Sequence, residues 1–137
     1  VPSTRPGMIL DTREIESGGC SDTLLIDVRE RDRFLGLSEP IDSMAGRIPG
    51  TVNHCYLDDL DADRLLRKPA ELRDRWQEIL GNRPPGSVAC MCGSGVTACL
   101  SLLAMEAAGL GGARLYAGSW SEWITDRRRP IVTGPED

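Results

Sequence analysis

The chain is 137 residues long, with 40% hydrophobic and 27% charged residues. That length corresponds to one domain, the composition is globular, and no apolar run is long enough to cross a bilayer. Sixteen basic and twenty-one acidic residues give a net charge of −5, so we expect neither nucleic acid nor a membrane as a partner.

Hydrophobic patterns and turn residues predict an alternation of strands and helices. The first half is expected to contain a linker at 1–8, a short helix at 11–17, a buried strand at 24–28, a helical turn at 29–35, a loop at 36–45 and a short strand at 51–53. The second half is expected to contain a helix at 70–80, a strand at 88–91, a helix at 96–108, a strand at 114–117 and a helix from 119 to about 125. Since each parallel return needs a crossover, the sequence predicts one α/β domain over 9–137, with a mainly parallel central sheet flanked by helices.

The helix at 96–108 is expected to be mostly buried because few of its side chains are polar. Its spacing places Cys99 on a predicted core stripe together with Val96, Leu100, Leu103 and Ala107. Cys99 is therefore interpreted as a packing residue.

The five cysteines are Cys20, Cys55, Cys90, Cys92 and Cys99. An odd number without the dense spacing of a disulfide scaffold, and no signal peptide before them, predicts reduced thiols and a cytoplasmic location. Cys90 and Cys92 alternate on a predicted strand, so their side chains face opposite ways. With His54 as the single histidine, we expect no metal site and no other cofactor.

The loop after the strand at 88–91 is the strongest chemical signal in the sequence. It reads Cys92-Gly93-Ser94-Gly95-Val96-Thr97, and its glycines let successive backbone N–H groups converge at the start of a helix. Such a loop stabilises the thiolate form of a cysteine, which makes Cys92 a candidate nucleophile.

Two other cysteine chemistries are disfavoured. A phosphatase needs an arginine six positions after the nucleophile, and that position is Ala98. A cysteine protease would have to use His54 as its base, and no neighbouring segment supports that pairing.

Four segments resemble a rhodanese domain, in the order found in that family. They are residues 25–29 (LIDVR), 46–53 (GRIPGTVN), 92–99 (CGSGVTAC) and 116–123 (YAGSWSEW). The resemblance covers roughly residues 9–134 and is greatest to the C-terminal catalytic domain of tandem-domain sulfurtransferases. It implies an upstream rhodanese-like domain, and since the chain begins with Val1 we expect sequence before it.

The resemblance also implies a mechanism and a set of site residues. Cys92 would take a sulfane sulfur from a small donor, hold it as a persulfide and pass it to a thiol or to cyanide. The persulfide would lie against the loop at Gly93, Gly95, Val96 and Thr97. Ser94 would bond the donor's carbonyl or assist proton transfer, or only shape the loop.

Donor recognition is less completely specified. The loop CGSGVTA resembles the 3-mercaptopyruvate form, whereas thiosulfate-type members tend to carry basic residues after the cysteine. Family members often have donor-binding arginines before and within the Gly-x-Ile-x-Gly turn, and residues 39–41 and 48–50 contain none. Arg47, at a position that is commonly histidine, is the nearest cation, and it would either pair with a donor carboxylate or form a structural ion pair. Asp27 and Arg29 are interpreted as a charge pair that anchors the following loop.

A non-catalytic rhodanese module for protein binding or persulfide carriage stays open as the alternative to a sulfurtransferase.

Overall fold

The computed structural model describes residues 5–18 and 21–136. Its strands form one sheet, in the order β1-β5-β4-β2-β3, and every neighbouring pair is parallel. The strands are β1 (Ile9–Leu10), β2 (Leu24–Asp27), β3 (Val52–Asn53), β4 (Val88–Met91) and β5 (Arg114–Tyr116). The predicted α/β class with a parallel central sheet is therefore confirmed.

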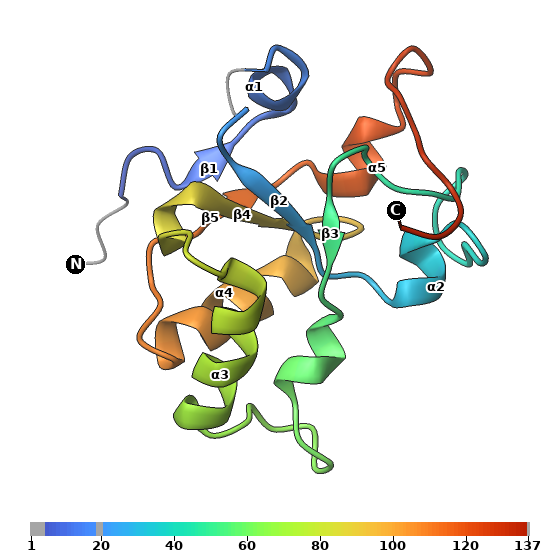
Figure 1. Cartoon of the computed structure of the whole chain (residues 1–137). Helices are drawn as coiled ribbons and strands as arrows, with labels where there is room; N and C mark the ends of the chain where they lie inside the picture. The colour runs from blue at the N-terminus through green and yellow to red at the C-terminus, as the bar shows by residue number, and fades with distance from the viewer. Residues whose placement is uncertain (1–4, 19–20, 137) are drawn as a thin grey trace.

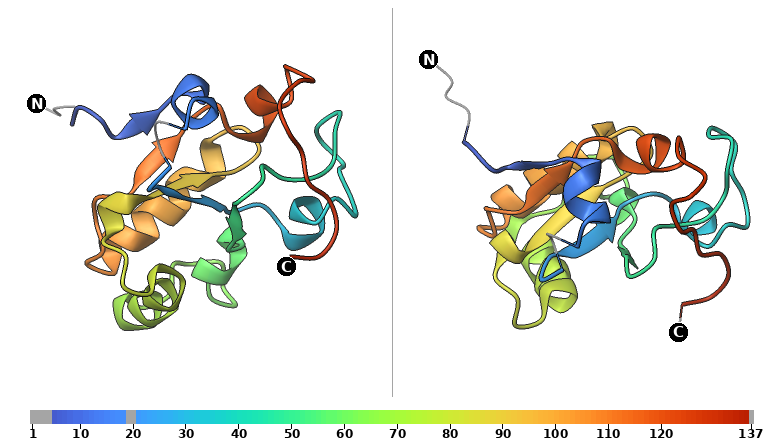
Figure 2. Two further views of the ribbon diagram at one scale, coloured as in Figure 1. Left: turned by 45° about the horizontal axis from the view of Figure 1, so that its top comes forward. Right: turned by 90° about the horizontal axis from the view of Figure 1, so that it is seen from above.

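The helices cover both faces of this sheet (Figures 1 and 2). They are α1 (Thr12–Glu16), α2 (Arg31–Phe34), α3 (Pro69–Leu80), α4 (Val96–Ala107) and α5 (Ser119–Trp123), with 3₁₀ turns η1 (Tyr56–Asp59) and η2 (Pro85–Ser87). Each expected helix and strand in the described residues is present to within a few residues. Strand β1 was not predicted; it is two residues long and is defined by pairing with β5, more than 100 residues away, which no local pattern shows.

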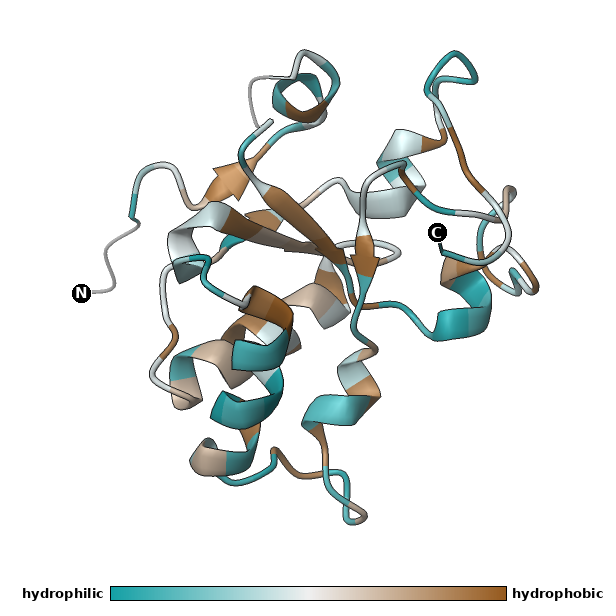
Figure 3. Cartoon of the chain, in the orientation of Figure 1, coloured by the Kyte–Doolittle hydropathy of each residue, from teal (hydrophilic) through white to brown (hydrophobic). Residues whose placement is uncertain are grey.

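Two apolar layers form the core, one on each face of the sheet. Cys90 of β4 packs toward α3 and α4, and its neighbour Met91 packs on the opposite side with Tyr116, Trp120 and Trp123. This alternation follows from the two-residue period of a strand. In Figure 3 the strands β2 and β4 are among the most hydrophobic segments, whereas the outer surface of α3 is hydrophilic.

The predicted core stripe of α4 is wrong. Val96 is 72% exposed, Leu103 is 56% exposed and Cys99 is also exposed. The side chains that face the core are instead Ala98, Ser101, Ala104 and Met105. Apolar residues surround this helix on all sides, so their spacing alone does not identify the buried face.

A buried carboxylate explains why a polar residue of α4 faces inward. Asp59 is fully buried at the end of η1 and accepts a hydrogen bond from Ser101 Oγ at 3.2 Å. The same carboxylate contacts Trp76 Nε1 and His54 Nε2, each at 2.9 Å. One side chain therefore connects η1, α3 and α4 beneath the sheet.

Within the described part of the chain, no helix has the length and apolar character needed to span a membrane. Cys20 and residues 1–4 of the predicted linker lie outside the described residues.

Candidate active site

The Cys92 loop connects the carboxyl end of β4 to the first turn of α4. Gly95 is the N-cap of α4 and has φ +88°, a left-handed conformation that favours glycine. A Cβ at this position would also collide with the carbonyl oxygen of Ala117. The backbone N–H of Gly95 points back to Cys92 Sγ at 3.1 Å, so the loop places a hydrogen-bond donor on the sulfur.

The segment between β5 and α5 supports the loop from behind. Ser119 Oγ accepts the N–H of Cys92 at 3.0 Å and donates to the carbonyl oxygen of Tyr116 at 2.8 Å. The N–H groups of Trp120 and Ser121 donate to the carbonyl oxygens of Cys92 and Gly93 at 3.0 and 2.9 Å. These bonds fix the backbone on both sides of the cysteine.

A pocket of about 170 Å³ opens in front of the loop. It is lined by Arg33, Ile41, Asp42, Gly93, Ser94, Val96 and Thr97. Four of the predicted site residues thus share one cavity, while Cys92 itself is 1% exposed and Gly95 is buried behind it. Ser94 is exposed at the mouth, where its hydroxyl can reach a bound molecule.

The opposite wall of the pocket carries an arginine that sequence reasoning did not identify as a site residue. A Cβ on Gly93 would lie 3.3 Å from Arg33 Nη2, so the Arg33 guanidinium lies directly against the loop. Its sequence position, within the helical turn at 29–35, gave no signal, because the contact joins segments about 60 residues apart.

Arg33 is held by two carboxylates. Its Nε contacts Glu39 Oε2 at 3.0 Å, and its Nη2 contacts Asp42 Oδ2 at 3.1 Å. Burial raises the pKa of Glu39, but the hydrogen bonds from Arg33 and from the backbone N–H groups of Asp42 and Ile41 outweigh it and hold the pKa below its ordinary value. Glu39 is therefore ionised at neutral pH and fixes this wall.

The predicted charge pair of Asp27 and Arg29 is confirmed. Arg29 Nη2 lies 2.7 Å from Asp27 Oδ2, and both side chains are buried. The same nitrogen donates to the carbonyl oxygen of Gly46 at 2.7 Å, and the guanidinium stacks 4.7 Å from the ring centre of Trp120. The pair thus anchors the loop that follows α2.

Arg47 lies away from this pocket. Its guanidinium donates to the carbonyl oxygens of Gly134 and Pro135 at 2.7 and 3.4 Å and stacks on Phe34 at 4.8 Å. The residue is 6% exposed, and the cavity it lines contains no residue of the Cys92 loop. Donor binding by Arg47 stays a prediction, while the contacts seen here join it to the C-terminal segment.

The environments of the other described cysteines differ from that of Cys92. Burial, with a small contribution from Asp59, raises the pKa of Cys90 to about 12. Burial likewise raises the pKa of Cys55, and Cys99 is exposed on the outer side of α4. Neither Cys90 nor Cys55 is therefore suited to act as a nucleophile at neutral pH.

The site combines a cysteine, the Gly95 N–H directed at its sulfur and a cation on the opposite wall of the pocket. A helix N-terminus and a turn of backbone N–H groups stabilise negative charge without a side-chain base. This arrangement suits a reaction in which negative charge develops on the sulfur of Cys92.

Residues 8–126 match the rhodanese-like domain. Together with the parallel sheet and the cysteine loop at its carboxyl edge, this match shows that the chain belongs to the rhodanese family.

The curated relatives are sulfurtransferases. The chain is 42% identical to a probable 3-mercaptopyruvate sulfurtransferase of Pseudomonas aeruginosa, an alignment that covers 96% of this chain and 50% of that protein. It is 41% identical to human 3-mercaptopyruvate sulfurtransferase and 37% identical to mouse thiosulfate sulfurtransferase, covering 77% and 80% of this chain and 36% and 37% of those proteins. The chain thus spans half or less of the length of these relatives.

The fold also occurs in a solved enzyme of anaerobic ergothioneine biosynthesis from Chlorobium limicola. That structure superposes with a TM-score of 0.83 at 24% identity, over 97% of this chain and 33% of the other. At this identity the similarity shows the shared fold.

Proposed function

We propose that this domain is a sulfurtransferase that carries sulfur as a persulfide on Cys92. The observation that carries the proposal is the position of Cys92 between β4 and the N-terminus of α4, with the Gly95 N–H 3.1 Å from its sulfur. The sulfurtransferase names of the curated relatives support the same reaction class.

The reaction has two transfers. The Cys92 thiolate attacks the transferable sulfur of the donor, which is the outer sulfur of thiosulfate or the thiol sulfur of 3-mercaptopyruvate. An S–S bond forms to Cys92, and the donor's S–S or C–S bond breaks with its electron pair leaving on sulfite or on the enolate of pyruvate. A thiolate or cyanide then attacks the outer sulfur, and the Cys92 thiolate leaves. Val96 and Thr97 form the first turn of α4, where backbone N–H groups have no intrahelical acceptor, and the helix N-terminus favours negative charge on the nearby sulfur.

Intact mass measurement tests the persulfide. After incubation with a donor and removal of the excess, the wild-type chain should gain the mass of one sulfur atom. Cys92→Ser should gain none, and Cys99→Ser, which changes an exposed thiol close to the loop, should gain sulfur as the wild type does. Sulfur on the Cys92→Ser chain would assign the carrier role to another thiol and overturn the assignment. No added sulfur on the wild type would leave the non-catalytic module as the better interpretation.

We propose 3-mercaptopyruvate as the preferred donor over thiosulfate. Gly93, Ser94 and Gly95 place no cation beside the attacking sulfur, and Arg33 is already paired with two carboxylates. Thiosulfate carries two charges on one small anion, whereas mercaptopyruvate carries one carboxylate away from its sulfur and a carbonyl within reach of a hydroxyl such as that of Ser94.

A side-by-side assay of both donors, with cyanide as acceptor, tests this preference. Wild type should show the higher kcat/KM with 3-mercaptopyruvate, and Ser94→Lys should move the donor ratio toward thiosulfate by about 1 to 3 kcal/mol. Ser94 is the place to add charge, since a side chain on Gly93 would crowd Arg33. A wild-type preference for thiosulfate would contradict the argument from loop charge.

A further inference from the structure

Two of the three nitrogens of the Arg33 guanidinium have hydrogen-bond partners among the described residues, and the third has none. Of the described residues that line the pocket, Arg33 alone is positively charged. Its Nε and Nη2 contact Glu39 and Asp42, whereas Nη1 makes no hydrogen bond to another described residue and lies 3.6 Å from the position of a Cβ on Gly93. The side chain is 14% exposed, so a ligand in the pocket can reach the guanidinium.

The two carboxylates on Arg33 are held differently. Glu39 accepts the N–H groups of Ile41 and Asp42 at 3.2 Å and also approaches Arg29 at 3.5 Å, so it is built into the wall. The carboxylate of Asp42 has Arg33 as its single partner among the described residues. Asp42 is 14% exposed and can therefore turn away from Arg33 without breaking other bonds.

Asp42 occupies the side of Arg33 that a ligand anion needs. From the position of a Cβ on Gly93, Asp42 Oδ2 lies at 3.8 Å and Arg33 Nη2 lies at 3.3 Å. A carboxylate that bound both terminal nitrogens of Arg33, the usual bidentate geometry, would have to take the position of Asp42. One guanidinium with two carboxylates also leaves this wall with a net negative charge, which repels a second anion.

We infer that Asp42 is a specificity-determining residue that competes with the anionic group of a ligand for Arg33. The competition lowers the affinity of the pocket for anions, and it disfavours a dianion more than a monoanion. The identification of the ligand as a sulfur donor rests on the proposed function, whereas the competition itself depends only on the geometry.

Alkylation of Cys92 by a charged and a neutral reagent tests the competition without any sulfur donor. Iodoacetate and iodoacetamide form the same S–C bond with loss of iodide, and they differ in the carboxylate. On a Cys99→Ser background, Asp42→Asn should raise the iodoacetate-to-iodoacetamide rate ratio at Cys92 about threefold to tenfold. The gain should shrink in high salt, since screening weakens exposed ion pairs.

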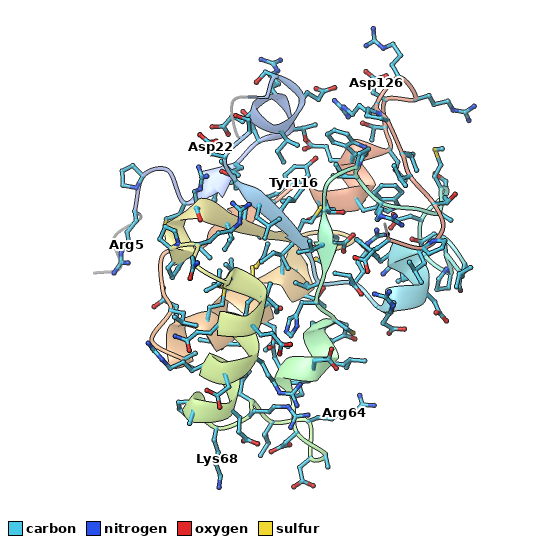
Figure 4. All side chains as sticks on the ribbon, viewed as in Figure 1. Arg5, Asp22, Arg64, Lys68, Tyr116 and Asp126 are labelled. Atoms are coloured by element: carbon cyan, nitrogen blue, oxygen red, sulfur yellow. The ribbon has the colours of Figure 1, made fainter. Side chains whose placement is uncertain are left out.

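Two further variants make the result specific. Asp126→Asn removes a carboxylate paired with Arg128 at 2.7 Å, on the turn after α5 at the top of Figure 4, and should leave the ratio unchanged. In Arg33→Gln the iodoacetate-to-iodoacetamide rate ratio at Cys92 should fall. The double variant Arg33→Gln with Asp42→Asn should have nearly the same low ratio, because the cation is absent. An unchanged ratio in Asp42→Asn, or the same gain without Arg33, would overturn the competition.

Donor kinetics then connect the competition to the proposed reaction. Asp42→Asn should lower KM for 3-mercaptopyruvate several-fold with kcat nearly unchanged, and it should lower KM for thiosulfate by a larger factor. A shifted alkylation ratio in a protein that forms no persulfide would sink the proposed function while leaving the anion competition in place. A shifted ratio with an unchanged KM would show that donors do not use Arg33 and would overturn the specificity role.

Discussion

Ser119 shows how one side chain can hold a reactive loop. Its φ of +56° is a left-handed conformation for a residue with a Cβ, and the side chain is fully buried. This strain is offset by two hydrogen bonds, one from the Cys92 N–H and one to the Tyr116 carbonyl. Because its oxygen takes the Cys92 N–H, the anion-binding donors of the loop come from the residues after Cys92.

Replacing Ser119 should separate its hydrogen bonds from its backbone strain. Ser119→Ala leaves a buried N–H and a buried carbonyl without partners and should lower the free energy of unfolding by about 1 to 3 kcal/mol. Ser119→Gly loses the same bonds but relieves the left-handed strain, so its loss should be smaller by about 1 kcal/mol. Urea denaturation of both variants measures the difference, and equal losses would show that the strain is negligible.

Arg47 allows a test between a structural and a ligand-binding role. Its guanidinium bonds two carbonyl oxygens of the C-terminal segment and stacks on Phe34. From these contacts we expect Arg47→Ala to lower the melting temperature and to leave the donor KM near that of wild type. A several-fold rise in KM at unchanged thermal stability would instead support the donor-binding role predicted from the sequence.

At the scale of elements, the placement of α4 depends on a buried carboxylate. Asp59 receives hydrogen bonds from Ser101 of α4, Trp76 of α3 and His54 after β3. Since α4 begins at the Cys92 loop, this network fixes the helix whose N-terminus faces the reacting sulfur. The inward position of Ser101 follows from the same bond.

Asp59→Leu should therefore destabilise the domain much more than loss of one of its partners. The apolar side chain leaves three buried donors, on Ser101, Trp76 and His54, without their acceptor, and we expect a loss of about 2 to 4 kcal/mol in the free energy of unfolding. Ser101→Ala removes one bond and should cost about 1 kcal/mol. Urea denaturation midpoints compare the two, and similar losses would contradict a shared network.

At the scale of the whole molecule, the chain has one core on two faces of a sheet and spans about half of its curated relatives. An active site that lacks a covering wall admits water and positions its substrate less well. We expect this domain to be completed by an upstream domain in the full-length protein.

This expectation is tested by comparing the domain with a longer chain. The domain alone should unfold cooperatively when followed by circular dichroism. Turnover should rise about tenfold or more when the natural upstream region is present. Equal turnover in both forms would show that the site is complete within these 137 residues.

The sequence by itself predicted the order of elements other than β1, the parallel sheet, and a glycine-rich loop at Cys92, Gly93, Ser94 and Gly95 between a strand and a helix. These features are local: strand and helix periods, glycines in a turn and a cysteine before a helix are all contained within a few adjacent residues. The charge pair of Asp27 and Arg29 is also a local feature that the sequence predicts, since its members are two residues apart.

The tertiary structure alone decided which distant residues meet at the site. Arg33 and Asp42 reach the Cys92 loop across the sheet edge, and Arg47 turns instead to the carbonyl oxygens of the C-terminal segment. It also selected the buried face of α4, because a helix that is apolar all round has no sequence signal for its orientation and takes it from partners such as Asp59. Contacts between residues far apart in the chain depend on how the layers pack, and no local pattern encodes that packing.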